Sequence, residues 1–163
     1  MRELLSYLQE HATEMLEDVE RLVRLESPSL DRDAINRVQG VNENWFGEFG
    51  RVTRHAADAG DTVHVQIEGR STGRMLLLAH VDTVYPAGAW GDVWRVADGR
   101  AYGPGVYDMK GGIVQARWAL RSLRALGRVP EHAIDVLLTA DEEVGSDAAR
   151  PLIESLARGA AAV

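Results

Sequence analysis

Two amphipathic helices are predicted near the start of the chain. Between residues 2 and 25, apolar residues recur mostly at spacings of three and four, with Glu and Arg between them, which is the helical repeat. Ser27-Pro28-Ser29 ends this first helix. A second repeat of the same kind runs from residue 33 to residue 49, and Gly50 terminates it.

Short β-rich segments follow these helices. Residues 51–56 and 62–68 are predicted to pair as a hairpin, because residues 57–61 have the composition of a turn. Residues 75–79 (MLLLA) are wholly apolar, which predicts a strand buried on both faces. Residues 133–139 (AIDVLLT) predict another buried strand.

Helical patterns alternate with these buried strands. One helix is expected over residues 109–126 and another over residues 151–156, the latter with Pro in its first turn. Residues 159–163 have the composition of the approach to a further strand. The order strand, helix, strand, helix predicts an α/β fold with a mixed, largely parallel sheet flanked by helices and with right-handed crossovers.

Composition and charge narrow the classes of function. The chain has 163 residues, of which 45% are hydrophobic and 26% charged, as expected for one globular domain. A net charge of -7 and a pI near 5.2 argue against nucleic acid and anionic membranes as partners. The first residues lack the apolar block of a signal peptide or membrane span, so a cytoplasmic location is expected. With no Cys, any metal must be held by His, Asp and Glu.

Polar residues follow the strand at residues 75–79. In open α/β sheets, ligands bind beyond the carboxyl ends of the strands. His80 and Asp82 are two residues apart, so in an extended segment their side chains point to the same side. His80 could then bind a metal while Asp82 fixes its orientation. The alternative is that His80 is a hydrogen-bonded structural histidine.

The second candidate segment is a glycine-rich loop, residues 102–112 (YGPGVYDMKGG), that runs into a helix. Its glycines do not match the spacing of phosphate-binding loops. Gly111 and Gly112 are costly at the start of a helix unless the backbone must approach a neighbour closely. We therefore expect the loop to place Asp108 in a crowded pocket, where its carboxylate could bridge two cations. The alternative is that Asp108 is a plain helix N-cap.

The third segment contains three adjacent acids, Asp141, Glu142 and Glu143, directly after the strand at residues 133–139. Their mutual repulsion is costly unless cations or solvent relieve it. Because neighbouring side chains in an extended segment diverge, Glu143 could bind a metal while Glu142 accepts a proton from the attacking water. A solvated loop is the alternative.

Together, the segments LLLAHVDTVYPAG, GRAYGPGVYDMKGG and LLTADEEVGS resemble the three amino-terminal signatures of a two-zinc metallopeptidase family. This family includes glutamate carboxypeptidase, aminoacylase, acetylornithine deacetylase and succinyl-diaminopimelate desuccinylase. The resemblance spans most of the chain. Tyr85 and the GPG sequence, in place of the more usual GRG, are most similar to the glutamate carboxypeptidase branch.

The resemblance implies a role for each candidate residue. His80 would bind one zinc, Glu143 the other, and Asp108 would bridge the two. Asp82 would steady His80, and Glu142 would be the general base. The family also has a cis peptide bond at the position of Asp108-Met109.

Ligand counting indicates an incomplete site. A hydrolytic zinc generally takes three protein ligands plus solvent, whereas His80 and Asp108 serve one metal here and Asp108 and Glu143 the other. The family supplies the remaining ligands from positions after Val163, and also inserts a lid or dimerisation domain. Residues 1–163 are therefore expected to be the amino-terminal portion of a catalytic domain, inactive alone.

Two classes of function follow from the sequence. In the first, the protein is a zinc hydrolase, with Co²⁺ or Mn²⁺ as possible substitutes, that cleaves an amide bond next to a carboxylate-bearing residue in a small peptide or N-acyl amino acid. Deacylation of N-acyl amino acids is a variant of this hypothesis. In the second, the chain is a non-catalytic domain that acts through protein contacts, as a homodimer or with a complementary polypeptide across the sheet edge.

Overall fold

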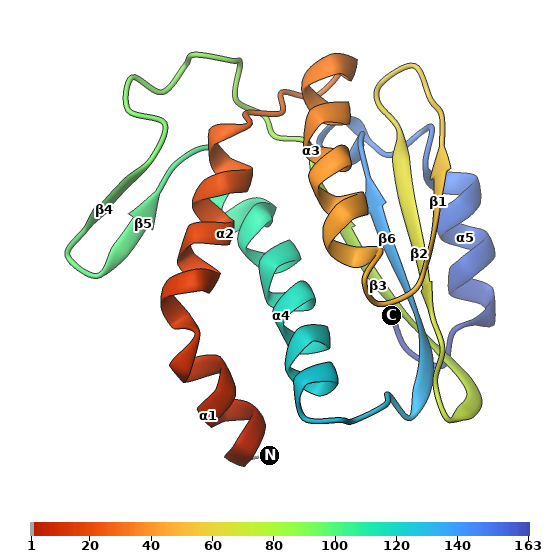
Figure 1. Cartoon of the computed structure of the whole chain (residues 1–163). Helices are drawn as coiled ribbons and strands as arrows, with labels where there is room; N and C mark the ends of the chain where they lie inside the picture. Colours follow the sequence, from red (N-terminus) through yellow and green to blue (C-terminus); the bar gives the residue numbers. More distant parts are fainter. Residues whose placement is uncertain (1) are drawn as a thin grey trace.

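A four-stranded mixed sheet lies between two layers of helices in the computed structural model, which describes residues 2–163 (Figure 1). The strand order is β1-β2-β6-β3, with β1 and β2 antiparallel, β2 and β6 antiparallel, and β3 and β6 parallel. The strands span Arg51–His55 (β1), Thr62–Ile67 (β2), Ser71–His80 (β3) and His132–Thr139 (β6).

The predicted mixed sheet flanked by helices is confirmed, although only the β3-β6 pair among its three strand pairs is parallel. The reason is the connection between β2 and β3, which consists of residues 68–70 alone. So short a connection makes β3 run back opposite to β2, and β6 inserts between them. Any strand in that place must be antiparallel to one neighbour, and the helical crossover from β3 makes β6 parallel to β3.

Helices cover both faces of the sheet. Figure 1 shows α1 to α4 on one side and α5 on the other. The core between the sheet and the first group contains Phe46, Val65, Ile113, Trp118 and Val136, all nearly inaccessible to solvent. The helices span Arg2–Glu10 (α1), Ala12–Arg24 (α2), Arg32–Phe46 (α3), Gly111–Ala125 (α4) and Arg150–Gly159 (α5).

The helix predicted over residues 2–25 is divided in two at His11. Its ring Nδ1 lies 2.8 Å from the carbonyl oxygen of Tyr7, and the two rings stack with centroids 4.2 Å apart. The φ of His11 is -108°, outside the helical range. The Tyr7 carbonyl also accepts the backbone N–H of His11 at 3.2 Å, so the ring contact accompanies the division without interrupting the helical hydrogen bonds.

Strand β3 is only partly buried, which corrects the prediction of a strand buried on both faces. Leu76 is buried, but Leu78 is 40% exposed. The difference arises because β3 is the edge strand of the sheet, with β6 on one side only. Along its outer edge, the backbone N–H of Leu76 donates to Ala162 and the N–H of Ala161 donates to Arg74, so residues 161–162 pair briefly with β3 as expected for the approach to a strand.

A second sheet, of two strands, was not predicted from the sequence. It consists of β4 (Arg95–Ala97) and β5 (Arg100–Tyr102), which are too short to show an alternating pattern. The predicted hairpin of β1 and β2 is confirmed.

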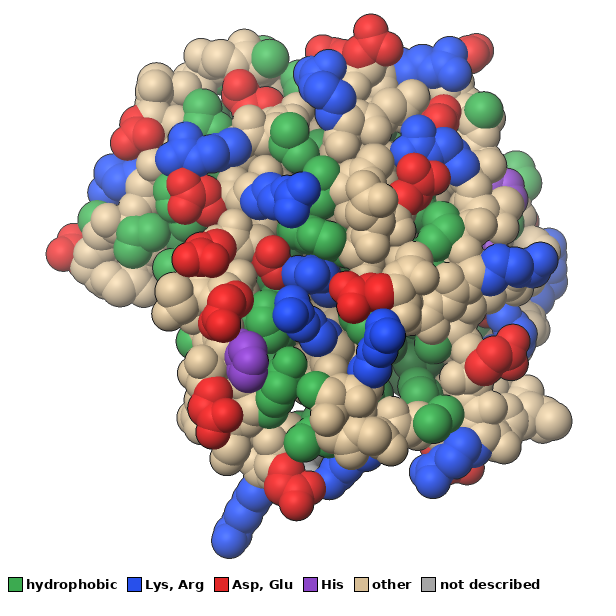
Figure 2. Space-filling view, in the orientation of Figure 1, with side chains coloured by type: hydrophobic (Ala, Val, Ile, Leu, Met, Phe, Trp, Pro, Cys, Tyr) green, Lys and Arg blue, Asp and Glu red, His purple; other side chains and the backbone are tan. Residues whose placement is uncertain are grey.

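The surface carries many charged side chains, in agreement with the 26% of charged residues in the chain. Across the face seen in Figure 2, basic and acidic side chains are interspersed, with hydrophobic side chains between them. Within residues 2–163, none of the helices combines the length and the apolar character needed to cross a lipid bilayer.

One buried ionic network ties the sheet together on the face opposite α3. Asp135 in β6 is 3% exposed and accepts hydrogen bonds from Arg74 Nε at 2.9 Å and Nη2 at 2.7 Å. Its Oδ1 also lies 2.7 Å from His64 Nε2 in β2. Asp135 therefore links the three adjacent strands β2, β6 and β3.

We expect Asp135→Ala to lower the free energy of unfolding by about 3 kcal/mol, because it leaves His64 and Arg74 without their shared acceptor. Glu131→Ala is the matched control, since Glu131 forms an exposed pair with Arg70 at 2.9 Å and should cost less than about 1 kcal/mol. Urea unfolding of both variants measures the difference. Equal losses would show that the network does not stabilise the sheet.

Candidate metal centre

Three polar segments meet at one end of the sheet. Because β3 and β6 are parallel, their carboxyl ends lie at the same edge, with His80 paired to Thr139. The loop after β6 forms a short 3-10 helix at Glu142–Val144. A third segment, the kinked turn at Val106–Lys110, precedes α4. These segments carry all five residues that the sequence analysis singled out.

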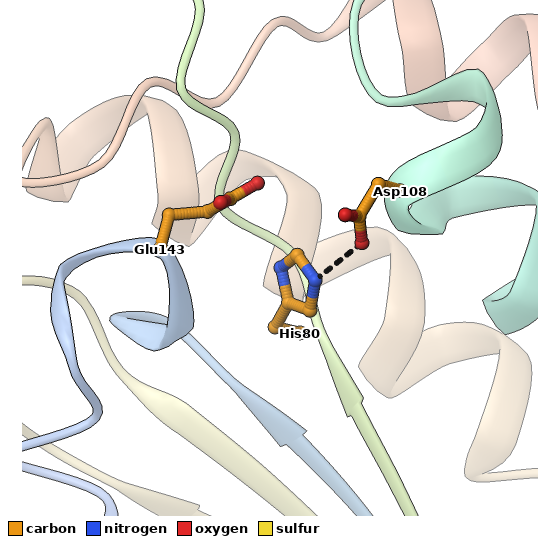
Figure 3. Close-up of side chains that lie close together, drawn as sticks. All are labelled: His80, Asp108 and Glu143. Atoms are coloured by element: carbon orange, nitrogen blue, oxygen red, sulfur yellow. Dashed lines mark hydrogen bonds and ion pairs between the residues drawn. The ribbon is translucent and has the colours of Figure 1, made fainter.

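His80, Asp108 and Glu143 form a cluster of potential metal ligands. One ligand atom from each side chain lies within 4.8 Å of the other two. Figure 3 shows the three side chains converging from β3, from the turn before α4 and from the loop after β6. His80 is buried, Glu143 is partly buried, and the Asp108 side chain is 68% exposed. The cluster is therefore anchored inside the protein and open to solvent on one side.

The His80 ring lies between acidic groups. Its Nε2 is 2.9 Å from Asp108 Oδ1 and 3.8 Å from Glu142 Oε2. Its Nδ1 is 3.1 Å from the backbone carbonyl of Asp82 and 3.4 Å from the Asp82 carboxylate. Burial alone would lower the pKa of His80, but the hydrogen bonds to Asp82 and Asp108 outweigh burial and raise the pKa to about 9. In the metal-free chain, both ring nitrogens therefore carry protons at neutral pH.

Asp82 is fully buried and accepts hydrogen bonds from separate segments. Ser29 Oγ donates to Oδ2 at 2.8 Å. The backbone N–H groups of Glu142 and Glu143 donate to Oδ1 and Oδ2, both at 3.2 Å. Burial would raise the pKa of Asp82, but the hydrogen bonds with His80 and Ser29 and from the Glu143 N–H lower it below its ordinary value. The residue thus joins the end of β3 to the loop that carries both glutamates.

The segment before α4 presents Asp108 to the cluster. Asp108 is not the N-cap of α4, because Lys110 occupies that position and α4 begins at Gly111. The alternative of a plain N-cap is therefore wrong. The Asp108-Met109 peptide bond is cis, as the family resemblance implied. A Cβ at Gly111 would lie 2.7 Å from the carbonyl oxygen of Val106, so this glycine is needed for a close backbone approach.

The three adjacent acids after β6 have different surroundings. Asp141 is 4% exposed, and its Oδ2 accepts the backbone N–H of Ala148 at 2.7 Å, so it shapes the loop. The Glu142 side chain is 54% exposed and lies beside His80. Burial and the carboxylate of Asp108 raise the pKa of Glu143, although His80 opposes them. A uniformly solvated loop does not describe this segment, because its first acid is buried.

A cavity of about 500 Å³ opens beside the cluster, with Asp108 and Glu143 in its lining. Its walls are rich in aromatic side chains, and the rings of Tyr85 and Trp90 meet edge to face with centroids 5.5 Å apart. The other lining residues include Val84, Tyr102, Val106 and Tyr107. A small molecule in this cavity would lie next to the potential ligands.

Comparison with known proteins identifies the family. Residues 76–163 match the model of peptidase family M20/M25/M40, and the chain belongs to this family of hydrolytic metalloenzymes. Carboxypeptidase G2 of Pseudomonas sp. (strain RS-16) is 32% identical over 149 residues, which are 88% of this chain and 36% of that protein. Succinyl-diaminopimelate desuccinylase of Rhodopseudomonas palustris (strain BisA53) is 40% identical over 94 residues, which are 54% of this chain and 24% of that protein.

Solved structures support the fold. Human carnosine dipeptidase 1 aligns with a TM-score of 0.83 over 94% of this chain and 37% of that chain, at 22% identity. The M20 family metallo-carboxypeptidase Sso-CP2 from Sulfolobus solfataricus aligns with a TM-score of 0.69 over 88% of this chain and 35% of that chain, at 18% identity. The matched part of the chain thus spans between about a quarter and a little over a third of the length of these relatives.

Two features of the site were not predicted from the sequence. Ser29 was expected only to end a helix, although its hydroxyl contacts Asp82. Asp141 was given no role of its own, although it shapes the loop that carries the two glutamates. No sequence signal marks the Ser29 contact, because its partner lies 53 positions further along the chain.

We expect His80 in the metal-free chain to titrate near pH 9, because Asp82 and Asp108 stabilise its charged form. The raised pKa means that the stabilisation is complete below the unfolded pKa of about 6.5 and is lost as the pH rises through about 9. NMR titration of the ring in the presence of a chelator measures this pKa. Asp108→Asn should bring it closer to 6.5, and an unchanged pKa in this variant would contradict the assignment.

Proposed function

We propose that this chain carries part of a two-zinc site in an enzyme that hydrolyses an amide or peptide bond next to a carboxylate-bearing residue. The observation that carries the proposal is the convergence of His80, Asp108 and Glu143, with Glu142 beside them. Family membership supports divalent-metal hydrolysis as the reaction class.

The donor set suits zinc. An imidazole and two carboxylates are ligands that Zn²⁺ takes, and the ligand atoms lie within 4.8 Å of one another, close enough to share two neighbouring cations. His80 would bind one cation, Glu143 the other, and the two oxygens of Asp108 would serve both. Co²⁺ or Mn²⁺ could occupy the same donors. Each cation would then have two ligands from this chain and need another from elsewhere.

The bound cations would polarise the scissile carbonyl and make water more acidic. Glu142 would act as general base, because its side chain is largely exposed and its Oε2 lies 3.8 Å from His80 Nε2, at the edge of the cluster. It would accept a proton from the attacking water and pass it to the leaving amine. Asp82 would hold His80 with Nδ1 facing away from the cluster, which leaves Nε2 as the ligand atom.

The substrate is proposed to be a small peptide or N-acyl amino acid. Similarity to carboxypeptidase G2 over most of the chain favours a substrate with a free carboxylate beside the scissile bond. Deacylation of an N-acyl amino acid is the second candidate, because succinyl-diaminopimelate desuccinylase and Myxococcus xanthus acetylornithine deacetylase match about half of the chain at 40% identity. Parallel assays of a longer polypeptide that continues this chain, with a dipeptide that ends in glutamate and with N-acetylornithine, separate the two.

The relatives also bear on the organisation of the protein. Since this chain covers 36% of carboxypeptidase G2, we propose that residues 1–163 are the amino-terminal portion of a catalytic domain. The missing ligands and a lid or dimerisation domain would come from further polypeptide. On this proposal the chain is inactive alone. The complete enzyme is expected to be cytoplasmic.

In a longer polypeptide that continues this chain, Glu142→Gln should lower kcat by about 10²–10⁴-fold, because the general base is lost. Its zinc content should remain at the wild-type level. The matched variant Glu143→Gln should instead lose zinc, as measured by metal analysis after gel filtration. Wild-type turnover of Glu142→Gln would contradict the assignment, and failure of the unaltered polypeptide to bind zinc would contradict the proposed metal site.

A further inference from the structure

The segment between α2 and α3 lies alongside the end of β3. The N–H of Thr83 donates to Ser27 O at 2.9 Å, and the N–H of Ser29 donates to Thr83 O at 3.0 Å. Pro28 and Thr83 form a parallel bridge. Ser27 is fully buried, and its Oγ donates to the backbone carbonyl of Val81 at 2.6 Å. Residues 27–29 therefore extend the sheet beside the candidate metal centre.

Ser29 adds a contact that Ser27 does not make. Its Oγ donates to Asp82 Oδ2 at 2.8 Å, the shortest hydrogen bond that this carboxylate accepts. The bonds from the N–H groups of Glu142 and Glu143 are both 3.2 Å, near the upper end of the normal range. The Ser29 bond has the ordinary length of an O–H···O bond, so loss of this hydroxyl would leave the carboxylate with its two long backbone bonds and its contact with His80.

We propose that Ser29 is a positioning residue for the metal centre. Through Asp82, its hydroxyl would hold His80 and the backbone of Glu142 and Glu143 in one mutual arrangement. The expected effect on metal affinity rests on the proposed function. The expected effect on the geometry of the metal-free chain does not. Partners that orient metal ligands typically change metal affinity by about 10–100-fold when removed.

The competing explanation is that Ser29 only tethers the segment to the sheet. Its hydroxyl also lies 3.3 Å from the carbonyl oxygen of Thr83, and this contact would tether the segment without involving the Asp82 carboxylate. Ser27 provides the comparison, because it lies in the same segment and bonds to the same stretch of backbone without touching Asp82. Loss of the Ser27 hydroxyl should weaken the tether and leave the carboxylate in place.

Three variants, made in a longer polypeptide that continues this chain, test the proposal: Ser29→Ala, Ser29→Thr and Ser27→Ala. Ser29→Ala should weaken Zn²⁺ binding by about tenfold in competition with a chromophoric chelator, while Ser29→Thr, which keeps the hydroxyl, restores it. Ser27→Ala should lower the melting temperature at least as much as Ser29→Ala and retain wild-type Zn²⁺ affinity. Equal effects of Ser27→Ala and Ser29→Ala on Zn²⁺ affinity would overturn the proposal.

A second measurement separates this proposal from the proposed function. In the metal-free chain, NMR should show altered amide proton shifts for Glu142 and Glu143 and altered ring nitrogen shifts for His80 in Ser29→Ala, but wild-type shifts in Ser27→Ala. If the wild-type form of the longer polypeptide binds no zinc while these shifts change in the metal-free chain, the proposed function fails and the positioning role stands. Unchanged shifts in Ser29→Ala would overturn the positioning role.

Discussion

The buried carboxylate of Asp82 is the interaction on which the candidate site depends. It has no exposure to solvent, so its charge is stabilised only by the donors around it. Those donors come from the segment after α2, from the end of β3 and from the loop after β6. One buried group thus holds together three parts of the chain, two of which carry potential metal ligands.

The parallel pairing of β3 and β6 allows the Asp82 carboxylate, just after β3, to contact the loop after β6. It brings the ends of two strands to one edge of the sheet, although more than fifty residues separate them in the chain. Helix α4 forms the crossover between the strands, and the turn before it supplies Asp108. The same connection that makes the two strands parallel therefore also delivers the third member of the cluster.

Charge within the cluster explains why it suits cations. Without a metal, the positive charge of His80 compensates for the surrounding carboxylates, as its raised pKa shows. The pKa of Asp82 is lowered because several donors bind its carboxylate, whereas burial and then the neighbouring acids raise the pKa of Glu143. A cation placed among Asp108, Glu142 and Glu143 would relieve the repulsion that adds to the effect of burial on the pKa of Glu143.

By itself, the sequence determined the elements with strong local patterns and the residues that could carry the chemistry. The helical repeat at residues 33–49, the apolar run at residues 133–139 and the polar groups that follow β3 and β6 are local properties that side-chain period and type reveal. Only the tertiary structure decided which strand lies at the sheet edge, how much of the pairing is antiparallel, and that Ser29 reaches Asp82. These depend on contacts between distant segments, and such contacts leave no periodic signal in the sequence.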